Sequence, residues 1–384
     1  MPTFVLAPDS FKESMTAEQA CQAMQRGIFQ VFPDARCIAV PMADGGEGTV
    51  DALLHSLEGQ CISCTVTGPL ATQQVSTYFA LVDQGQTAII EMAKANGIHL
   101  LEPSQRNPML TSTYGTGEMI RNALDLGVKK IIIGLGGSVT NDGGAGMAQA
   151  LGVQFFDTTG EQIQVCGGNL NQIERIDFSH LDQRLKNTEI LIASDVNNPL
   201  CGPNGASEIF GPQKGAMPEM VQLLDQNLSH FADLVEAGLG ISKRNIPGAG
   251  AAGGLGFGLM VFAEANLQSG VELIIQQSRL AEKIAQADYV LTGEGKIDHQ
   301  TALGKTPFGV AQVTKQFNKP VIAFAGLVGE GIESLYEEGF SQIVGINPPG
   351  CSLGEALKNA EQNLEQACAR VMKEIKTKLE QQNR

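Results

Sequence analysis

The sequence predicts an α/β protein with two domains built on mainly parallel sheets. Its 384 residues suit two domains of ordinary size better than one or three. A hydrophobic fraction of 43% is enough to form buried cores and excludes a disordered chain. Short apolar strands alternate with helical patterns near both ends of the chain, as in parallel sheets joined by right-handed crossovers.

The N-terminal region predicts one strand–helix–strand unit. A short apolar strand spans 3–7 and stops at Pro8. Thr16–Gln19 has the spacing of a capping box, and the helix that follows it ends at Pro33. A second strand spans 37–40, so the chain opens as a βαβ unit of a parallel sheet.

The middle of the chain predicts both hairpins and further crossovers. Residues 60–66 and 74–92 are rich in Thr, Val and Ile with turn signals between them, which is typical of antiparallel hairpins. A helix is expected over 116–126, and a buried strand at 130–133 follows it. Another buried strand is expected at 189–193.

Three late strands define the predicted domain division. They are expected at 288–291, 320–325 and 342–346. A long last helix is expected over 353–379. Because the late strands and the N-terminal unit are both of the parallel type, we expect them to share one sheet. Residues 1–62 and 286–384 then form one discontinuous α/β domain, and 63–285 form an α/β domain inserted in it, with the hairpins and a glycine-rich loop.

Charge and composition narrow the class of partner. The chain has 26 basic and 41 acidic residues, and its net charge of −15 argues against binding to nucleic acid or to an anionic membrane. The N-terminus has no basic stretch before Pro8, and no apolar run approaches the length of a membrane span, so we expect a cytoplasmic protein. The eight cysteines lack a metal-binding arrangement and are expected to be reduced structural thiols.

Small and acidic residues gather where the predicted strands end, which is where open α/β sheets bind ligands. The carboxylates in these loops are Asp9, Asp44, Glu47, Asp142, Asp195, Glu294 and Asp298, and the lysines beside them are Lys12, Lys296 and Lys305. Mg²⁺ prefers one or two carboxylates together with phosphate oxygens, and lysine neutralises phosphate charge. The pattern therefore predicts a cleft for Mg²⁺ and phosphates.

The loop at 134–146 is the strongest candidate for anion binding. It contains six glycines, follows a buried strand and opens a helix near Gly144. Free backbone N–H groups in such a loop can hold a phosphate or a carboxylate. The residues expected to make these contacts are Gly136, Gly137, Ser138, Thr140 and Asn141.

Two formal motif matches do not meet their structural requirements. Gly248–Gly253 fits the dinucleotide pattern G-x-G-x-x-G but follows no strand, so it predicts a mobile or closely packed glycine turn. Gly304–Thr306 resembles the end of a Walker A loop, but His299 occupies the position of the required upstream glycine. Lys305 remains a candidate for a point-charge contact with phosphate.

Four motifs resemble those of the bacterial two-domain glycerate kinase family. They lie at 7–14, 41–49, 136–144 and 291–298. The resemblance implies ATP-dependent phosphorylation of D-glycerate in glyoxylate or sugar-acid catabolism, with ATP and Mg²⁺ as cofactors. It also implies two α/β domains, one of them flavodoxin-like, with the active site between them. The residues leave open which hydroxyl accepts the phosphoryl group, and the resemblance favours the 2-hydroxyl.

The candidate residues then take three roles. Asp195 is the first choice for the base that accepts the hydroxyl proton, because it ends a buried strand, and Asp298 is the alternative. Lys12 is expected to contact the charged part of a substrate and completes the catalytic group. The substrate- and phosphate-binding candidates are Asp9, Ser10, Gly136, Gly137, Ser138, Thr140, Asn141, Lys296 and Lys305. The metal-binding candidates are Asp44, Glu47 and Glu294.

Two other functions compete with phosphoryl transfer. An NAD(P)-dependent oxidoreductase of a small hydroxy acid needs a glycine fingerprint directly after a strand, which the chain lacks. A non-catalytic two-domain protein that binds a small acid would not need several carboxylates suited to Mg²⁺. The expected partners are therefore glycerate and ATP, with neither nucleic acid nor membrane, and a homo-oligomer remains open.

Overall fold

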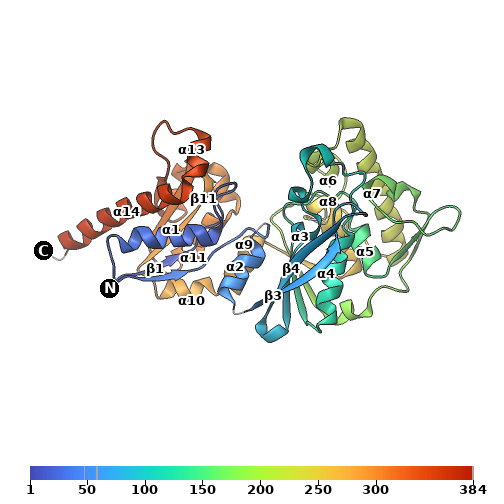
Figure 1. The fold of residues 1–384 in the computed structure, drawn as a ribbon, viewed down its shortest axis with the longest axis horizontal. Helices are drawn as coiled ribbons and strands as arrows, with labels where there is room; N and C mark the ends of the chain where they lie inside the picture. The colour runs from blue at the N-terminus through green and yellow to red at the C-terminus, as the bar shows by residue number, and fades with distance from the viewer. Residues whose placement is uncertain (47, 58, 383–384) are drawn as a thin grey trace. The chain divides into compact units, whose positions relative to one another are not determined.

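The computed structural model describes residues 1–46, 48–57 and 59–382. The chain divides into two compact units (Figure 1). Unit 1 consists of Met1–Asp44, Asp51–Leu57 and Val271–Arg384, and unit 2 of Gly45–Val50 and Glu58–Gly270. The sequence predicted a division at 62/63 and 285/286. The main difference is that the helices between Val271 and Ala285 group with unit 1.

Unit 1 contains a parallel sheet. Its strands are β1 (Thr3–Leu6), β2 (Arg36–Ala39), β11 (Tyr289–Ile297), β12 (Val321–Val328) and β13 (Phe340–Gly345). Within the described residues their order is β13-β12-β11-β1-β2, and every neighbouring pair is parallel. Counted along this unit, the order is 2-1-3-4-5, which is the flavodoxin-like order. The expected flavodoxin-like sheet is confirmed.

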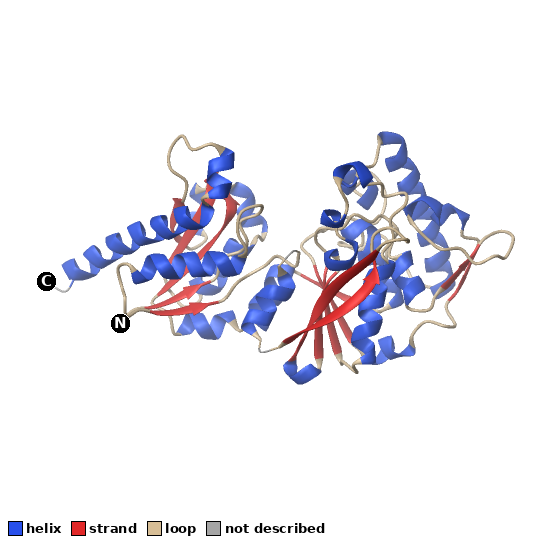
Figure 2. Ribbon diagram, in the orientation of Figure 1, coloured by secondary structure: helices blue, strands red, loops and turns tan. Residues whose placement is uncertain are grey.

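Helices surround this sheet (Figure 2). They are α1 (Ala17–Phe29), α2 (Thr49–Ser56), α9 (Gly270–Gln277), α10 (Leu280–Ala285), α11 (Thr306–Lys315), α12 (Glu333–Glu337), α13 (Leu353–Lys358) and α14 (Ala360–Gln382). Helix α1 begins at Thr16 with the predicted capping box and packs along α14. Gly27 permits this close approach, because a Cβ there would lie 2.6 Å from the carbonyl oxygen of Glu365.

The single long helix predicted over 353–379 is instead two helices. Helix α13 ends at Lys358, and Asn359 has a non-helical backbone with ψ of 14°. The carbonyl of Asn359 accepts a hydrogen bond from the N–H of Asn363, so α14 starts immediately after the break. Asparagine disfavours helix interiors because its side chain competes for local backbone hydrogen bonds, and apolar periodicity alone does not reveal such an interruption.

Unit 2 contains a mixed sheet. Its strands are β3 (Gln60–Thr67), β4 (Gln74–Val82), β5 (Thr87–Glu91), β6 (Lys130–Gly134), β9 (Glu189–Ala193) and β10 (Asn266–Gln268), in the order β10-β9-β6-β5-β4-β3. The pairs β3–β4 and β4–β5 are antiparallel, which confirms the predicted hairpins. The remaining pairs are parallel. A separate antiparallel pair joins β7 (Gln154–Phe156) and β8 (Arg175–Asp177).

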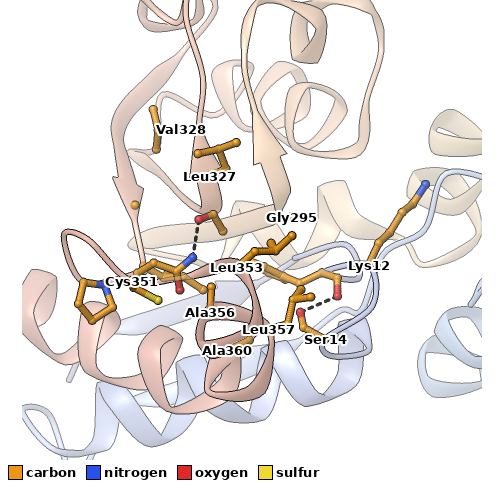
Figure 3. A pocket seen from close by; sticks show the side chains of 16 residues that line it. Lys12, Ser14, Gly295, Leu327, Val328, Cys351, Leu353, Ala356, Leu357 and Ala360 are labelled. Atoms are coloured by element: carbon orange, nitrogen blue, oxygen red, sulfur yellow. Dashed lines mark hydrogen bonds between the residues drawn. The ribbon is translucent and has the colours of Figure 1, made fainter.

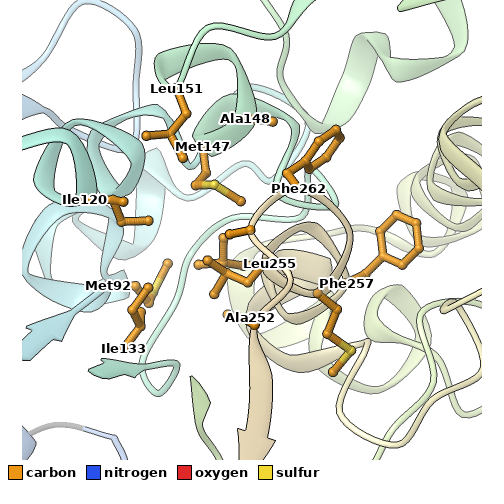
Figure 4. Packing of buried hydrophobic residues seen from close by; sticks show 14 of the residues in the cluster. Met92, Ile120, Ile133, Met147, Ala148, Leu151, Ala252, Leu255, Phe257 and Phe262 are labelled. Atoms are coloured by element: carbon orange, nitrogen blue, oxygen red, sulfur yellow. The ribbon is translucent and has the colours of Figure 1, made fainter. Parts of the chain in front are cut away.

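The helices of unit 2 enclose a large apolar core. They are α3 (Ala93–Asn96), α4 (Tyr114–Asp125), α5 (Ala145–Ala150), α6 (Ala206–Phe210), α7 (Pro218–Leu239) and α8 (Ala251–Phe262). Every residue of α8 is buried, and Leu255 lies among Met92, Ile133 and Met147 in this core (Figure 4). Strand β10, which follows α8, was not expected from the sequence.

Short 3₁₀ helices complete the described chain. They are η1 (Asp83–Gly85), η2 (Ile98–Leu100), η3 (Pro103–Gln105), η4 (Gly167–Gln172), η5 (Gln183–Asn187), η6 (Pro212–Lys214) and η7 (His299–Leu303). Among the described residues no helix has both the length and the apolar character needed to cross a membrane.

Candidate functional site

In unit 1, a group of charged side chains lies past the end of β1 and beside the last residues of β11. The sequence predicted Glu294 and Lys296 in a loop after a strand that ends at 291, but β11 continues to Ile297 and both residues lie within it. Asp9 follows β1, and its N–H donates to the carbonyl of Gly293 at 2.8 Å, which holds it beside β11. The hydroxyl of Thr306, at the start of α11, donates to Asp9 Oδ2 at 2.5 Å. The backbone N–H of Ser10 donates to Asp9 Oδ1 at 2.6 Å. Burial, reinforced by the charge of Asp44, raises the pKa of Asp9 to about 7.

Glu294 is the second carboxylate of this group. Its Oε1 accepts a hydrogen bond from the hydroxyl of Thr301 at 3.2 Å and lies 3.9 Å from Lys305 Nζ. Burial raises the pKa of Glu294 to about 7, and the charge of Asp9 acts in the same direction, while Lys305 opposes it. Asp9 and Glu294 therefore hold negative charge at an energetic cost, which a bound cation would remove.

This donor set fits Mg²⁺ bound jointly with phosphate. Mg²⁺ takes one or two carboxylates and completes its shell with water and phosphate oxygens, so it does not require a cage of protein side chains. Residues 1–46, 48–57 and 59–382 contain no group of three or more His, Cys, Asp or Glu arranged around a metal position. Of the three predicted metal ligands, Glu294 and Asp44 interact electrostatically with Asp9, and Glu47 lies outside the described residues.

The predicted lysines of unit 1 differ in their surroundings. Lys296 Nζ lies 2.7 Å from Asp298 Oδ2 and forms an ion pair with it. Lys305 instead has its Nζ 3.9 Å from Glu294 Oε1. Lys12 is exposed, and Figure 3 shows its side chain extending away from the apolar residues of a neighbouring pocket.

Asp298 is held by several groups at once. Its side chain is 5% exposed, pairs with Lys296 and accepts the N–H of Gln300 at 2.9 Å as the N-cap of η7. The hydrogen bond from Lys296 holds the pKa of Asp298 below its ordinary value. A carboxylate stabilised in this way is a weak proton acceptor, so the geometry favours a capping role over a basic one.

In unit 2, the glycine-rich loop after β6 has a defined structure. The N–H of Ile98 donates to the carbonyl of Gly137 at 2.8 Å, and the N–H of Val139 donates to the carbonyl of Asn96 at 3.1 Å. Gly137 has a φ of +71°, which disfavours any side chain at this turn. Only the Gly136–Gly137 turn of this stretch reaches the surface, since Ser138, Thr140 and Asn141 are buried.

Asp142 organises the end of this loop. It is fully buried and accepts the N–H and hydroxyl of Thr113 at 2.7 and 2.8 Å. It also accepts the N–H groups of Gly144 and Gly146, each at 3.1 Å. Burial raises the pKa of Asp142, and these four hydrogen bonds oppose the increase. The residue therefore ties the loop to the segment before α4 rather than facing a ligand.

Sequence reasoning missed Lys214, which supports the same loop. This buried lysine ends η6, and its Nζ donates to Ser138 Oγ at 2.8 Å and to the carbonyl of Thr140 at 2.7 Å. Burial lowers the pKa of Lys214 to about 7, although the charge of Asp142 acts against the decrease. The residue lies far from the loop in the chain and follows no strand. The one local feature of the sequence that could have drawn attention to Lys214 is its position between Pro212 and Gly215.

Two polar atoms of the loop are left without hydrogen-bond partners. Among the described residues, Thr140 Oγ1 and Asn141 Oδ1 are buried and unpaired. Asn141 uses its Nδ2 to donate to Ser207 Oγ at 2.8 Å. Buried polar groups are normally paired, so these atoms retain hydrogen-bonding capacity beside Lys214.

Asp195 lies at the same sheet edge as the loop. Strands β6 and β9 are parallel neighbours, with Gly134 opposite Ala193, so the glycine-rich loop and Asp195 leave from adjacent strand ends. Asp195 is exposed, and its Oδ1 accepts the N–H of Gly270 at 3.1 Å. This hydrogen bond orients the carboxylate without removing it from solvent.

Comparison with known proteins gives consistent results. The model of the glycerate kinase family matches residues 4–376. A glycerate kinase of Haemophilus influenzae is 51% identical over 361 residues, which cover 94% of this chain and 95% of that protein. The glycerate 2-kinase of Escherichia coli is 46% identical over 360 residues, 94% of each chain. A crystal structure of a glycerate kinase 2 from Salmonella typhimurium LT2 is similar with a TM-score of 0.87, 43% identity and 99% coverage of both chains.

Proposed function

Since the chain belongs to the glycerate kinase family, we propose that it transfers the γ-phosphoryl group of ATP to D-glycerate. The proposed acceptor is the 2-hydroxyl, which gives 2-phosphoglycerate. The observation that carries the reaction class is the pair of partly buried carboxylates, Asp9 and Glu294, whose pKa values are both raised, together with Lys305 beside Glu294. Phosphoryl transfer depends mainly on positioning and charge neutralisation, and this group supplies both.

Unit 1 is proposed to hold the nucleotide phosphates. Asp9 and Glu294 would hold Mg²⁺, which when bound neutralises the charge spread over the phosphate oxygens. Lys305 contributes positive charge next to Glu294, and the exposed Lys12 has the reach to contact a phosphate. Lys296 is proposed to act mainly through its ion pair with Asp298.

Unit 2 is proposed to bind the organic acid and accept its proton. The exposed turn at Gly136–Gly137 offers backbone N–H groups to a carboxylate, and Lys214 supports this loop from the buried side. Asp195 is the proposed base, because its carboxylate is exposed and is oriented by the N–H of Gly270, whereas the carboxylate of Asp298 is buried and paired with Lys296. Under this proposal the partners are small molecules and the protein acts in the cytoplasm.

The decisive experiment is an assay of ADP release by the purified protein with D-glycerate and ATP, with and without Mg²⁺. We expect ADP formation that requires both glycerate and Mg²⁺, and ³¹P–¹H correlation of the product identifies the phosphorylated hydroxyl. The absence of ADP formation, together with glycerate-dependent reduction of NAD(P)⁺, would overturn the proposal in favour of an oxidoreductase. Tight glycerate binding without turnover would instead indicate a non-catalytic binding protein.

A further inference from the structure

A pocket of about 490 Å³ lies within unit 1. It lies at the last residues of β11, β12 and β13, and α13 forms one of its walls (Figure 3). Its lining is mainly apolar and includes Leu327 and Val328 at the end of β12, Ile346 after β13, and Leu353 and Leu357 of α13. The volume is in the range of small-molecule sites, and the pocket is open to solvent at Leu327 and Leu353, which are exposed.

The polar side chains in this pocket are used to build its walls. Asn347 Nδ2 donates to the carbonyl of Gly326 at 2.7 Å, and Asn347 Oδ1 accepts from Asn363 Nδ2 at 2.9 Å. The hydroxyl of Ser14 donates to the carbonyl of Phe11 at 2.8 Å. Among the described lining residues only Lys12 carries a charge, and its side chain extends outward (Figure 3). The interior therefore favours an uncharged ligand group with large apolar faces.

The pocket is lined by residues that are close in sequence to the carboxylates of unit 1. Gly295, which lines it, follows Glu294 in β11, and Phe11, which also lines it, lies two residues after Asp9. The hydrogen bond from Asp9 N–H to the Gly293 carbonyl holds these two segments together. One of these segments lies in β11 and the other follows β1, which is the neighbouring strand. The point between these two strands is the switch point at which a flavodoxin-like sheet binds its ligand.

We propose that this pocket binds the adenine base of ATP. This assignment rests on the proposed function, which gives glycerate and ATP as the two substrates that the pocket could bind. Glycerate is a small acid with a polar group on every carbon, whereas adenine has two broad apolar faces that match the walls formed by β12 and α13. With the base in the pocket, the phosphates extend past Lys12 toward Asp9 and Glu294.

Filling the pocket tests the assignment by kinetics. Ala356 is half-buried on α13 and faces the pocket, so Ala356→Phe places a ring where the base would lie (Figure 3). We expect the KM for ATP to rise about tenfold or more, while the KM for glycerate changes by less than about twofold. Competitive inhibition by adenosine should be lost, and inhibition by tripolyphosphate should remain. The matched control is Ala237→Phe at an exposed position of α7 in unit 2, which should behave as the wild type.

A thiol measurement on the unaltered protein gives an independent test. Cys351 lines the pocket and is partly exposed, whereas Cys61 is exposed on β3 in unit 2 and serves as an internal control. Saturating adenosine should slow alkylation of Cys351 by iodoacetamide about fivefold or more, as expected for a buried thiol, and leave Cys61 unchanged. Tripolyphosphate should protect neither thiol.

The two proposals fail in different ways. If the wild type forms ADP with glycerate, but adenosine does not protect Cys351 and Ala356→Phe keeps its KM for ATP, the pocket assignment is overturned and the kinase function stands. If the wild type forms no ADP with glycerate but adenosine protects Cys351, the proposed function fails and the pocket is supported as a nucleoside site.

Discussion

Asp195 and Asp298 both follow strands, yet their surroundings differ. Asp298 is buried, ion-paired with Lys296 and engaged as a helix cap, whereas Asp195 is exposed and accepts a hydrogen bond from Gly270. A general base must be able to take up a proton from the substrate, which the ion pair of Asp298 disfavours. The choice between the two aspartates can be tested with isosteric variants.

We predict that Asp195→Asn lowers kcat by roughly 10²–10⁴ with little effect on ATP binding, because the amide keeps the shape of the side chain but cannot accept the proton. Asp298→Asn should reduce the stability of the η7 cap and lower kcat much less. The measurement is kcat for both variants across titrations of Mg²⁺ and Mn²⁺. Near-normal turnover of Asp195→Asn, or its recovery at high metal concentration, would remove Asp195 from the role of base.

Lys214 gives a prediction about stability and pH. Its pKa is about 7 in the folded protein against an ordinary value of 10.5, so between these values the unfolded chain binds a proton that the folded chain does not. The free energy of unfolding contributed by this group therefore rises with pH from about 7 to about 10.5 and is constant below about 7.

Lys214→Met should remove this pH dependence. We therefore predict that the free energy of unfolding of the wild type rises by about 2–4 kcal/mol relative to that of the variant between pH 7 and pH 10.5. Urea unfolding at several pH values between 6.5 and 9.5 measures a part of this gain. Lys358→Met, at an exposed position of α13, is the matched control for loss of a lysine. A difference between wild type and Lys214→Met that is the same at every pH would contradict the prediction.

At the scale of elements, the glycine-rich start of α8 is closely packed. The sequence allowed either a mobile or a closely packed turn at Gly248–Gly253, and the structure has the second. A Cβ at Gly253 would lie 2.0 Å from the carbonyl oxygen of Thr140, and one at Gly254 would lie 2.7 Å from Gly143 Cα. This segment therefore supports the glycine-rich loop from behind by backbone-to-backbone contact.

We predict that Gly253→Ala destabilises the protein by about 1–3 kcal/mol more than Gly240→Ala. Both glycines have a φ of +67°, so the backbone penalty of a side chain is matched. They differ in space, because nothing lies within 4 Å of a Cβ at Gly240, the C-cap of α7. Chemical denaturation of both variants gives the comparison, and equal losses would show that the contact with Thr140 relaxes freely.

At the scale of the whole molecule, the two units have separate apolar cores. Leu364 of α14 is fully buried in the core of unit 1, and Leu228 of α7 is fully buried in that of unit 2. Unit 1 is assembled from three chain segments, so its core depends on contacts between residues far apart in sequence. Loss of one core should therefore be detectable apart from the other.

We predict that Leu364→Ala and Leu228→Ala each cost about 2–4 kcal/mol, because each leaves a cavity at a fully buried position. Hydrogen exchange followed by mass spectrometry should show faster exchange in β1 and β12 for the first variant, and in β6 and β9 for the second. If either variant accelerates exchange equally in all four strands, the two units unfold as one cooperative structure.

The sequence by itself determined the features that depend on neighbouring residues. Strands at 130–133 and 189–193, the hairpin region and the capping box at Thr16 were predicted, because apolar periodicity and turn chemistry are local. Strand β10 was missed, since its three residues are too few to establish a pattern. The break at Asn359 was missed because apolar spacing continues across it.

The tertiary structure alone decided how the charged side chains are used. Sequence placed Asp9, Glu294 and Asp298 at strand ends, but only the fold brings Thr306 to Asp9 across 297 residues and leaves Asp298 paired with Lys296. Lys214 reaches Ser138 across 76 residues, a contact that no local pattern encodes. Burial and partners set the free energy of a charge, and both come from segments that meet only when the chain has folded.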